Sequence, residues 1–140
     1  MRLQRLRPWI ELVLLGLHIV AVIFIFKIIE DRKVAGVVAG ALFLEIGLLT
    51  MFLEWKWGRK WGSLAFWAAA IFFLGSAVPV MGLRLTHWEM AFDDIQWLGV
   101  TGRQLHQMGN GTYMAMLLMA VVEGLRDRWA LRGARGRTRH

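Results

Sequence analysis

Long apolar stretches alternate with short polar connections along this chain. Four such stretches cover residues 9–29, 34–53, 61–83 and 105–125. Each is close to the roughly 20 residues that a helix needs to cross the hydrocarbon core of a bilayer. Backbone amides in hydrocarbon must bond within their own segment, so each stretch is expected to be a helix. The pattern therefore predicts an all-α membrane protein folded as a four-transmembrane-helix bundle.

The composition agrees with this fold class. The chain has 140 residues, of which 57% are hydrophobic and 19% are charged. That length allows a single domain, placed here at residues 1–130, and a basic tail at residues 131–140 that is expected to be disordered. The sequence contains no cysteine, which excludes disulfide bonds, thiolate metal sites and thiol catalysis.

Positive charge is distributed unequally between the two predicted sides of the membrane. Twelve of the 17 Lys and Arg residues lie before the first stretch, between the second and the third, or after the fourth. Because cytoplasmic connections carry an excess of Lys and Arg, both termini are predicted to be cytoplasmic. The expected location is the bacterial inner (plasma) membrane, which the chain crosses several times.

The connection at residues 84–104 is long enough to have structure of its own. Its apolar residues recur at intervals of three and four, at Leu85, Trp88, Ala91, Phe92 and Ile95. That spacing is typical of a helix with one apolar face. We therefore expect a short amphipathic helix on the outer surface, between the third and fourth spans.

Two ionisable residues lie deep within the predicted spans. Glu45 is eight residues from the cytoplasmic end of the second stretch, and His18 is nine residues from Trp9 in the first. Both are therefore roughly 12–14 Å deep at helical rise, and a hydrogen bond between them would satisfy both groups. Such a pair is either structural or a site that carries a proton or binds a ligand.

Three glycines are expected to mark a packing face on the second span. Gly36, Gly40 and Gly47 fall on one side of that helix, and Glu45 falls on the opposite side. Gly36 and Gly40 form the small-xxx-small pattern that lets two helices approach closely. The sequence therefore predicts protein contacts on two sides of this helix, as in an oligomer or a larger complex.

Polar clusters outside the spans give weaker candidates. A divalent metal has possible ligands on the outer side, where His87, Glu89, Asp93, Asp94 and His106 are expected, although a solvated acidic patch is the simpler interpretation. The arginines of the C-terminal region are expected to attract anionic lipid headgroups rather than nucleic acid; they are Arg126, Arg128, Arg132, Arg135, Arg137 and Arg139. We find no phosphate-binding glycine loop, no nucleophile with a base and no paired carboxylates in an apolar setting, so an enzyme is disfavoured.

Part of the chain resembles a known family. The residues concerned are Val78-Pro79-Val80-Met81-Gly82, Ile95-Gln96-Trp97-Leu98-Gly99 and Leu105-His106. Over about residues 78–123 this arrangement resembles the four-helix di-haem membrane cytochrome b family, in which four intramembrane histidines hold two haems. His18 would match the first-helix ligand and His106 the outer ligand of the fourth helix. The second helix has no histidine, so the resemblance implies a relative without haems or one with a single haem b.

Together these features predict a small non-catalytic integral membrane subunit or scaffold of a larger membrane complex. Its expected partners are membrane lipid and other integral membrane subunits or further copies of itself. No cofactor is predicted outside the haem resemblance. Two alternatives remain: a haem-binding electron-transfer subunit, with His18, His87 and His106 as possible ligands, and a small proton or ion transporter or channel using Glu45 and His18.

Overall fold

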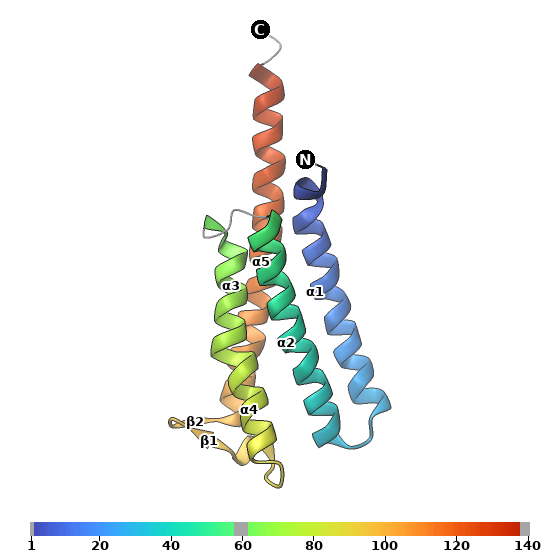
Figure 1. Ribbon diagram of the computed structural model, residues 1–140, viewed down its shortest axis with the longest axis vertical. Helices are drawn as coiled ribbons and strands as arrows, with labels where there is room; N and C mark the ends of the chain where they lie inside the picture. The colour runs from blue at the N-terminus through green and yellow to red at the C-terminus, as the bar shows by residue number, and fades with distance from the viewer. Residues whose placement is uncertain (1, 58–61, 138–140) are drawn as a thin grey trace.

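Four helical rods stand side by side in the computed structural model, which describes residues 2–57 and 62–137 (Figure 1). The third rod is built from three consecutive helical segments. The elements are α1 (Arg2–Ile28), α2 (Arg32–Trp57), the third rod of α3 (Leu64–Phe72), η2 (Phe73–Ala77) and α4 (Val78–Thr86), and α5 (Gly102–Arg137). Both α1 and the third rod pack against α2 and α5. The N- and C-terminal ends lie at the same end of the bundle.

Three of the described helices are long and apolar enough to cross a membrane. They are the part of α1 from Leu6 to Ile28, the whole of α2 from Arg32 to Trp57, and the third rod from Leu64 to Thr86. The prediction of a helical membrane protein is confirmed at this level. Among the described residues, α5 does not reach the same apolar threshold, because His106, Asn110 and Glu123 interrupt it.

The third rod contains a local irregularity near its centre. Its middle segment, Phe73–Ala77, is a π-helical turn, and Pro79 follows at the start of α4. Proline has no N–H to donate to the preceding turn, so a wider turn at this point lets the rod continue. The rod then runs on past Gly82 to Thr86, three residues beyond the predicted end.

The centre of the bundle is apolar and rich in aromatic contacts. Phe43, Phe72 and Tyr113 meet edge to face, with ring centroids 5.5–6.0 Å apart. The Tyr113 hydroxyl donates to the Leu15 carbonyl at 2.6 Å, which satisfies the only polar atom of that side chain and ties α5 to α1.

The connection between α4 and α5 differs from the sequence prediction. Instead of an amphipathic helix it forms a short 3₁₀ turn, η3 (Phe92–Asp94), and a hairpin of β1 (Gln96–Trp97) and β2 (Val100–Thr101). Leu98 and Gly99 form the two-residue turn with φ of 51° and 79°, which a helix cannot accommodate. A periodic pattern of only five apolar positions could not distinguish an amphipathic helix from this turn and hairpin.

The C-terminal region also differs from its prediction. The helix α5 continues to Arg137, so most of the tail expected to be disordered from residue 131 is helical, and residues 138–140 lie outside the described part. Alanine, leucine and arginine are strong helix formers, and extending an existing helix avoids the unfavourable nucleation step. Composition alone therefore underestimated the length of this helix.

Candidate functional site

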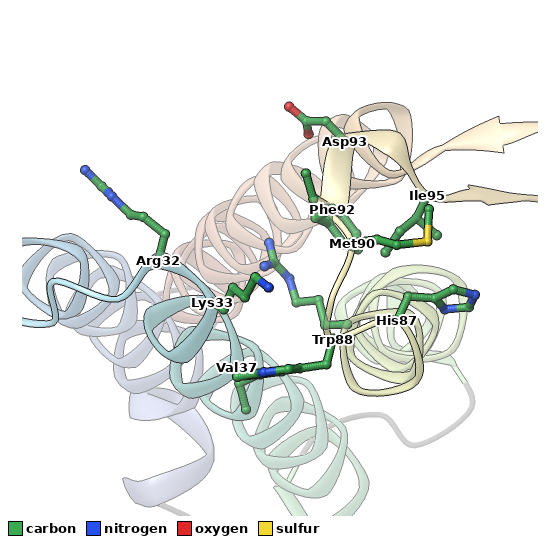
Figure 2. Close-up of a pocket in the computed structure, with 11 residues that line it drawn as sticks. Arg32, Lys33, Val37, His87, Trp88, Met90, Phe92, Asp93 and Ile95 are labelled. Carbon is green, nitrogen blue, oxygen red and sulfur yellow. The ribbon is translucent and has the colours of Figure 1, made fainter.

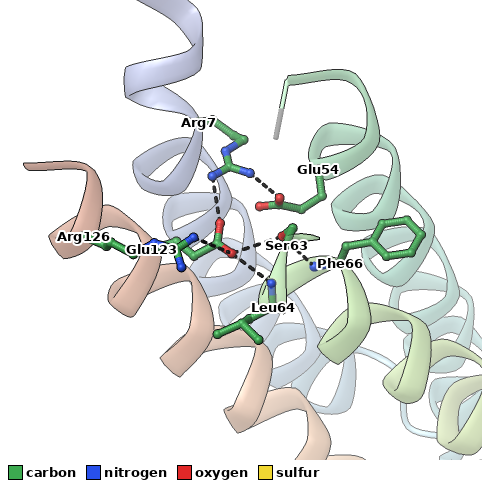
Figure 3. A network of polar contacts seen from close by, with 7 residues as sticks. All are labelled: Arg7, Glu54, Ser63, Leu64, Phe66, Glu123 and Arg126. Atoms are coloured by element: carbon green, nitrogen blue, oxygen red, sulfur yellow. Dashed lines mark hydrogen bonds and ion pairs between the residues drawn. The ribbon is translucent and has the colours of Figure 1, made fainter. Parts of the chain in front are cut away.

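A cluster of charged side chains is buried where the rods meet near the terminal end of the bundle (Figure 3). Arg7 of α1 is at its centre. One guanidinium nitrogen donates to the carboxylate of Glu54 on α2, and the other donates to Glu123 on α5 at 2.8 Å. The three side chains are 4%, 0% and 1% exposed, respectively. These are ion pairs removed from solvent, so breaking either one leaves a buried charge without a partner.

The same cluster fixes the start of the third rod. Ser63 caps α3 by accepting a hydrogen bond from the Phe66 amide at 3.1 Å. The Ser63 hydroxyl donates to Glu123 at 3.2 Å, and the Leu64 amide donates to the same carboxylate oxygen at 3.0 Å. A carboxylate at a helix N-terminus is favoured by the helix dipole. Through Arg7 and Glu123, the cluster therefore connects all four rods.

A third carboxyl group belongs to this cluster. Glu11 lies one turn along α1 from Arg7, is 1% exposed, and has the Glu54 carboxyl group as its neighbour. It interacts electrostatically with Arg7, Glu54 and Glu123. Three carboxyl groups thus surround one guanidinium. The cluster can hold the rods together, and its surplus of carboxyl groups gives it the capacity to accept a proton.

Sequence reasoning missed this cluster. It counted Arg7 only with the flanking positive charge, and its statement that there are no paired carboxylates in an apolar setting is wrong. The available signal was depth along the spans. Arg7 and Glu11 lie near the start of α1, Glu54 lies near the end of α2, and Glu123 lies in α5, so antiparallel packing places all four at one level.

The predicted pair of His18 and Glu45 is not formed. The two make no hydrogen bond or ion pair with each other, although both lie in the described part of the chain. The His18 ring instead bonds through Nδ1 to the Leu14 carbonyl at 2.9 Å, within its own helix. Glu45 is exposed on the outside of α2. Whether either residue carries out chemistry stays a prediction.

Glu45 belongs to a regular stripe on α2, defined here as the outer stripe. Its members are all exposed and are spaced alternately by four and three residues: Val34, Val38, Ala41, Glu45, Leu48 and Phe52. Such spacing keeps one face of a helix aligned along its length. The outer stripe is the face opposite the glycines, as the sequence predicted.

The glycine face of α2 is covered by the chain itself. A Cβ added to Gly36 would overlap the side chain of Arg84, and one added to Gly40 would lie 2.9 Å from the Met81 sulfur. Gly47 lies against Phe73, at 3.2 Å by the same construction. The prediction of close approach is therefore correct, but the neighbour is the third rod. Contacts from an oligomer or a larger complex were expected on this helix, whereas the third rod of the same chain lies on its glycine face.

Two adjoining cavities open at the opposite end of the bundle. The larger one, about 360 Å³, lies between the start of α2 and the connection after α4, and Figure 2 shows residues that line it. The second, about 330 Å³, extends between α1, α2, α4 and α5. Both are lined by Arg84, Phe92 and Asp93. Their volumes fall in the range of small-molecule sites.

The residues suggested for a metal or a haem are spread over this end. The exposed His87 ring is hydrogen-bonded to the Thr86 hydroxyl at 2.9 Å, and His106 lines the second cavity. Within residues 2–57 and 62–137, no group of three or more His, Asp or Glu side chains is placed to hold a metal ion. The resemblance to the di-haem cytochromes, with His18 and His106 as ligands, stays a prediction.

Some of the C-terminal arginines have contacts within the bundle. Arg126 lies 4.0 Å from the Glu123 carboxylate, and the Arg128 guanidinium stacks over the Trp9 ring at 4.3 Å from its centroid. Backbone positions in α5 are described for Arg132, Arg135 and Arg137, and Arg139 lies outside the described residues. Their predicted attraction to lipid headgroups stays a prediction.

Comparison with known proteins gives no match to a protein family, a curated protein or a solved structure. The functional argument therefore depends on the buried cluster, the outer stripe and the two cavities.

Proposed function

We propose that this chain is a small, non-catalytic integral membrane subunit of a larger membrane assembly, and that the outer stripe of α2 contacts its partner. In this proposal α5 is the fourth span, and both termini lie on the cytoplasmic side of a bacterial inner membrane. The polar side chains Tyr113 and Glu123 of α5 form hydrogen bonds with other rods of the chain, which makes this less apolar helix tolerable in a bilayer.

The observation that carries the proposal is the exposure of Glu45. It lies 13 residues from the first residue of α2 and 12 from the last, so about 18–20 Å of helix separates it from either end. A charged side chain at such a depth is unfavourable by about 3 kcal/mol on insertion scales, and it is normally directed to protein or to a water-filled cavity. The fold provides neither at Glu45, so a hydrogen-bond donor on a neighbouring span is the simplest way to satisfy it.

The other residues of the outer stripe fit helix packing. The alternating spacing gives a continuous face, and Ala41 is a small residue next to Glu45 that lets a second backbone come near. A polar residue at the centre of an otherwise apolar seam fixes register and partner choice. This combination supports a specific interface over random lipid exposure.

Replacing Glu45 tests the proposal in native membranes or mild detergent. Glu45→Leu should release the chain from its complex on a native gel, because leucine cannot replace the hydrogen bond. Glu45→Gln should retain the complex, since the amide still bonds across the interface. A bulky residue in the stripe, Leu48→Trp, should also weaken association. The matched control is Leu74→Trp, because Leu74 is 65% exposed on the third rod, outside the stripe.

Two results would contradict the proposal: wild-type protein that is monomeric in membranes by crosslinking, or complexes that survive both Glu45→Leu and Leu48→Trp. Co-expressing two differently tagged copies identifies the partner. Recovery of both tags indicates self-association, and recovery of one tag with additional subunits indicates a mixed complex.

A second candidate function is proton transport, which the buried Glu11 carboxyl group favours. Sequence reasoning attached this function to Glu45 and His18, whereas Glu11 is the carboxyl buried among other titratable groups. The protein reconstituted into vesicles should dissipate an imposed proton gradient if this function holds. Glu11→Gln should abolish the effect and Glu45→Gln should preserve it. An intact gradient with wild-type protein would rule the candidate out.

A further inference from the structure

The cavities at the end opposite the termini are built around one guanidinium group. Arg84 extends from the last turn of α4 and crosses the face of α2 at Gly36, where any larger residue would displace it. Its guanidinium carbon lies 4.2 Å from the centre of the Phe92 ring. Stacking on an aromatic ring holds an arginine in place and leaves its N–H donors available. The space left by Gly36 and the ring of Phe92 therefore position the Arg84 side chain.

Arg84 has no direct counter-ion. Among the described residues it makes no ion pair and no side-chain hydrogen bond, and the nearest acidic influence is Asp93, which acts on it electrostatically. The Asp93 carboxylate points away from Lys33 (Figure 2). Lys33 and Arg32 also line the larger cavity. Three cations and one carboxylate give this chamber a positive charge, so it attracts an anion.

The second cavity adds an apolar chamber beside the charged one. From the shared residues Arg84 and Phe92 it continues along side chains that are mostly hydrocarbon, at Val22, Phe26, Phe43 and Val80. A soluble anion would gain nothing from such a lining. A molecule with an anionic head and a hydrocarbon body would fill both chambers, because burial of its chain removes apolar surface from water.

The position along the bundle fits the same class of ligand. Three helices that can span a membrane end or begin near these cavities, at Ile28, Arg32 and Thr86, which is the level of the lipid headgroups in a bilayer. Exposed Trp88 lines the same cavity, and tryptophan prefers this interfacial level.

We propose that the paired cavities bind an anionic phospholipid, with its phosphate on Arg84 and one acyl chain in the apolar chamber. The planar guanidinium presents two parallel N–H groups to two phosphate oxygens, which is its preferred geometry with phosphate. Lys33 adds a second positive charge to the headgroup. Zwitterionic lipid has a phosphate too, but its cationic group would face Lys33, so a net negative headgroup is selected.

The test is native mass spectrometry of the purified full chain, with phosphatidylglycerol and phosphatidylcholine offered in equal amounts in mixed micelles. Wild-type protein should retain phosphatidylglycerol preferentially. Arg84→Gln should weaken that binding about tenfold or more, the loss expected for a charge-assisted hydrogen bond. Gly36→Ala should weaken it by displacing the guanidinium while keeping the charge. The matched control is Gly82→Ala, because a Cβ at Gly82 meets no atom within 4 Å.

Further arms separate the possible sources of the phosphate and the effect of misfolding. Millimolar inorganic phosphate should not displace the lipid, and displacement would show that only the free anion is recognised, which overturns the proposal. Equal retention of both lipids, or unchanged retention in Arg84→Gln, would overturn it as well. Arg84→Lys keeps a positive charge but lacks the two parallel N–H groups of the guanidinium. A melting temperature like that of the wild type, together with weakened lipid binding, would support the site independently of folding.

Discussion

Replacing Arg7 by methionine removes the one cation from the buried cluster while keeping a side chain of similar length. In the folded chain Arg7 donates to both Glu54 and Glu123. Its loss leaves these two carboxylates, together with Glu11, buried, and the partly exposed Arg126, 4.0 Å from Glu123, is then the nearby opposite charge. The same change in the unfolded chain has little effect, because the carboxylates are then solvated. The substitution should therefore destabilise the folded state selectively.

The magnitude follows from the burial of the groups. Removing one member of a buried ion pair typically destabilises by about 3–5 kcal/mol, because an uncompensated charge remains. Two carboxylates lose a direct partner here, which places Arg7→Met at the upper part of that range. Glu123 keeps hydrogen bonds from Ser63 and Leu64, so the loss should not be twice that of a single pair.

A second variant in the same cluster should have the opposite sign. Glu11→Gln replaces a buried carboxyl group by an uncharged amide of the same shape, so Glu54, Glu123 and Arg7 keep their ion pairs. Stability should be unchanged or raised. The free energy of unfolding, measured by titration from mild detergent into dodecyl sulfate with circular dichroism as the signal, distinguishes the two. Equal destabilisation by Arg7→Met and Glu11→Gln would refute the electrostatic reasoning and indicate that the site responds only to packing.

Three further predictions concern the backbone and the helix contacts. Gly40→Leu should destabilise the folded chain by about 1–3 kcal/mol through overpacking, because its Cβ would already approach the Met81 sulfur. The control in the same titration is Gly16→Leu, since a Cβ at Gly16 meets nothing within 4 Å. Equal stability of both variants would contradict the assigned contact. Gly102→Ala should disrupt the start of α5, because the added Cβ would overlap the Phe92 carbonyl oxygen; amide hydrogen exchange of residues 95–105 should accelerate, and unchanged protection would count against the close approach. Leu98→Asn should stabilise the hairpin by about 1 kcal/mol, since asparagine tolerates a positive φ better than leucine does. Hydrogen exchange of the Thr101 amide should then be slower. Faster exchange would show that the exposed Leu98 side chain has a stabilising contact of its own.

Much of the architecture could be predicted because hydrocarbon leaves few choices. A run of about 20 apolar residues in a bilayer must be helical, and this rule located the rods despite errors at their ends. The ends were misplaced because helices continue into polar sequence. The first rod starts at Arg2, well before the apolar run, so a hydropathy boundary marks the edge of the membrane and not the edge of the helix.

The buried cluster escaped sequence reasoning for a related reason. Arg7 was counted as evidence of sidedness, and a residue used for that purpose is assumed to lie in water. Because the helix includes it, the guanidinium instead turns inward, toward Glu54 and Glu123. Comparing the depths of charges on antiparallel spans would have brought these residues together. The glycines of α2 show a second limit of sequence reasoning: small residues indicate close packing, but they do not identify which helix packs against them.

The way this chain treats its acidic residues gives the strongest reason to look for a partner. Within the bundle, Glu11, Glu54 and Glu123 are each at most 1% exposed, grouped around one arginine, so the fold can cover a carboxylate where its own helices allow it. Glu45 has no such cover, although it lies at the centre of α2. The face that packs against the third rod is occupied by glycines, and the outer stripe is left over. A chain that buries three acids around one arginine and exposes a fourth at mid-helix is most simply explained if a neighbouring subunit completes that face.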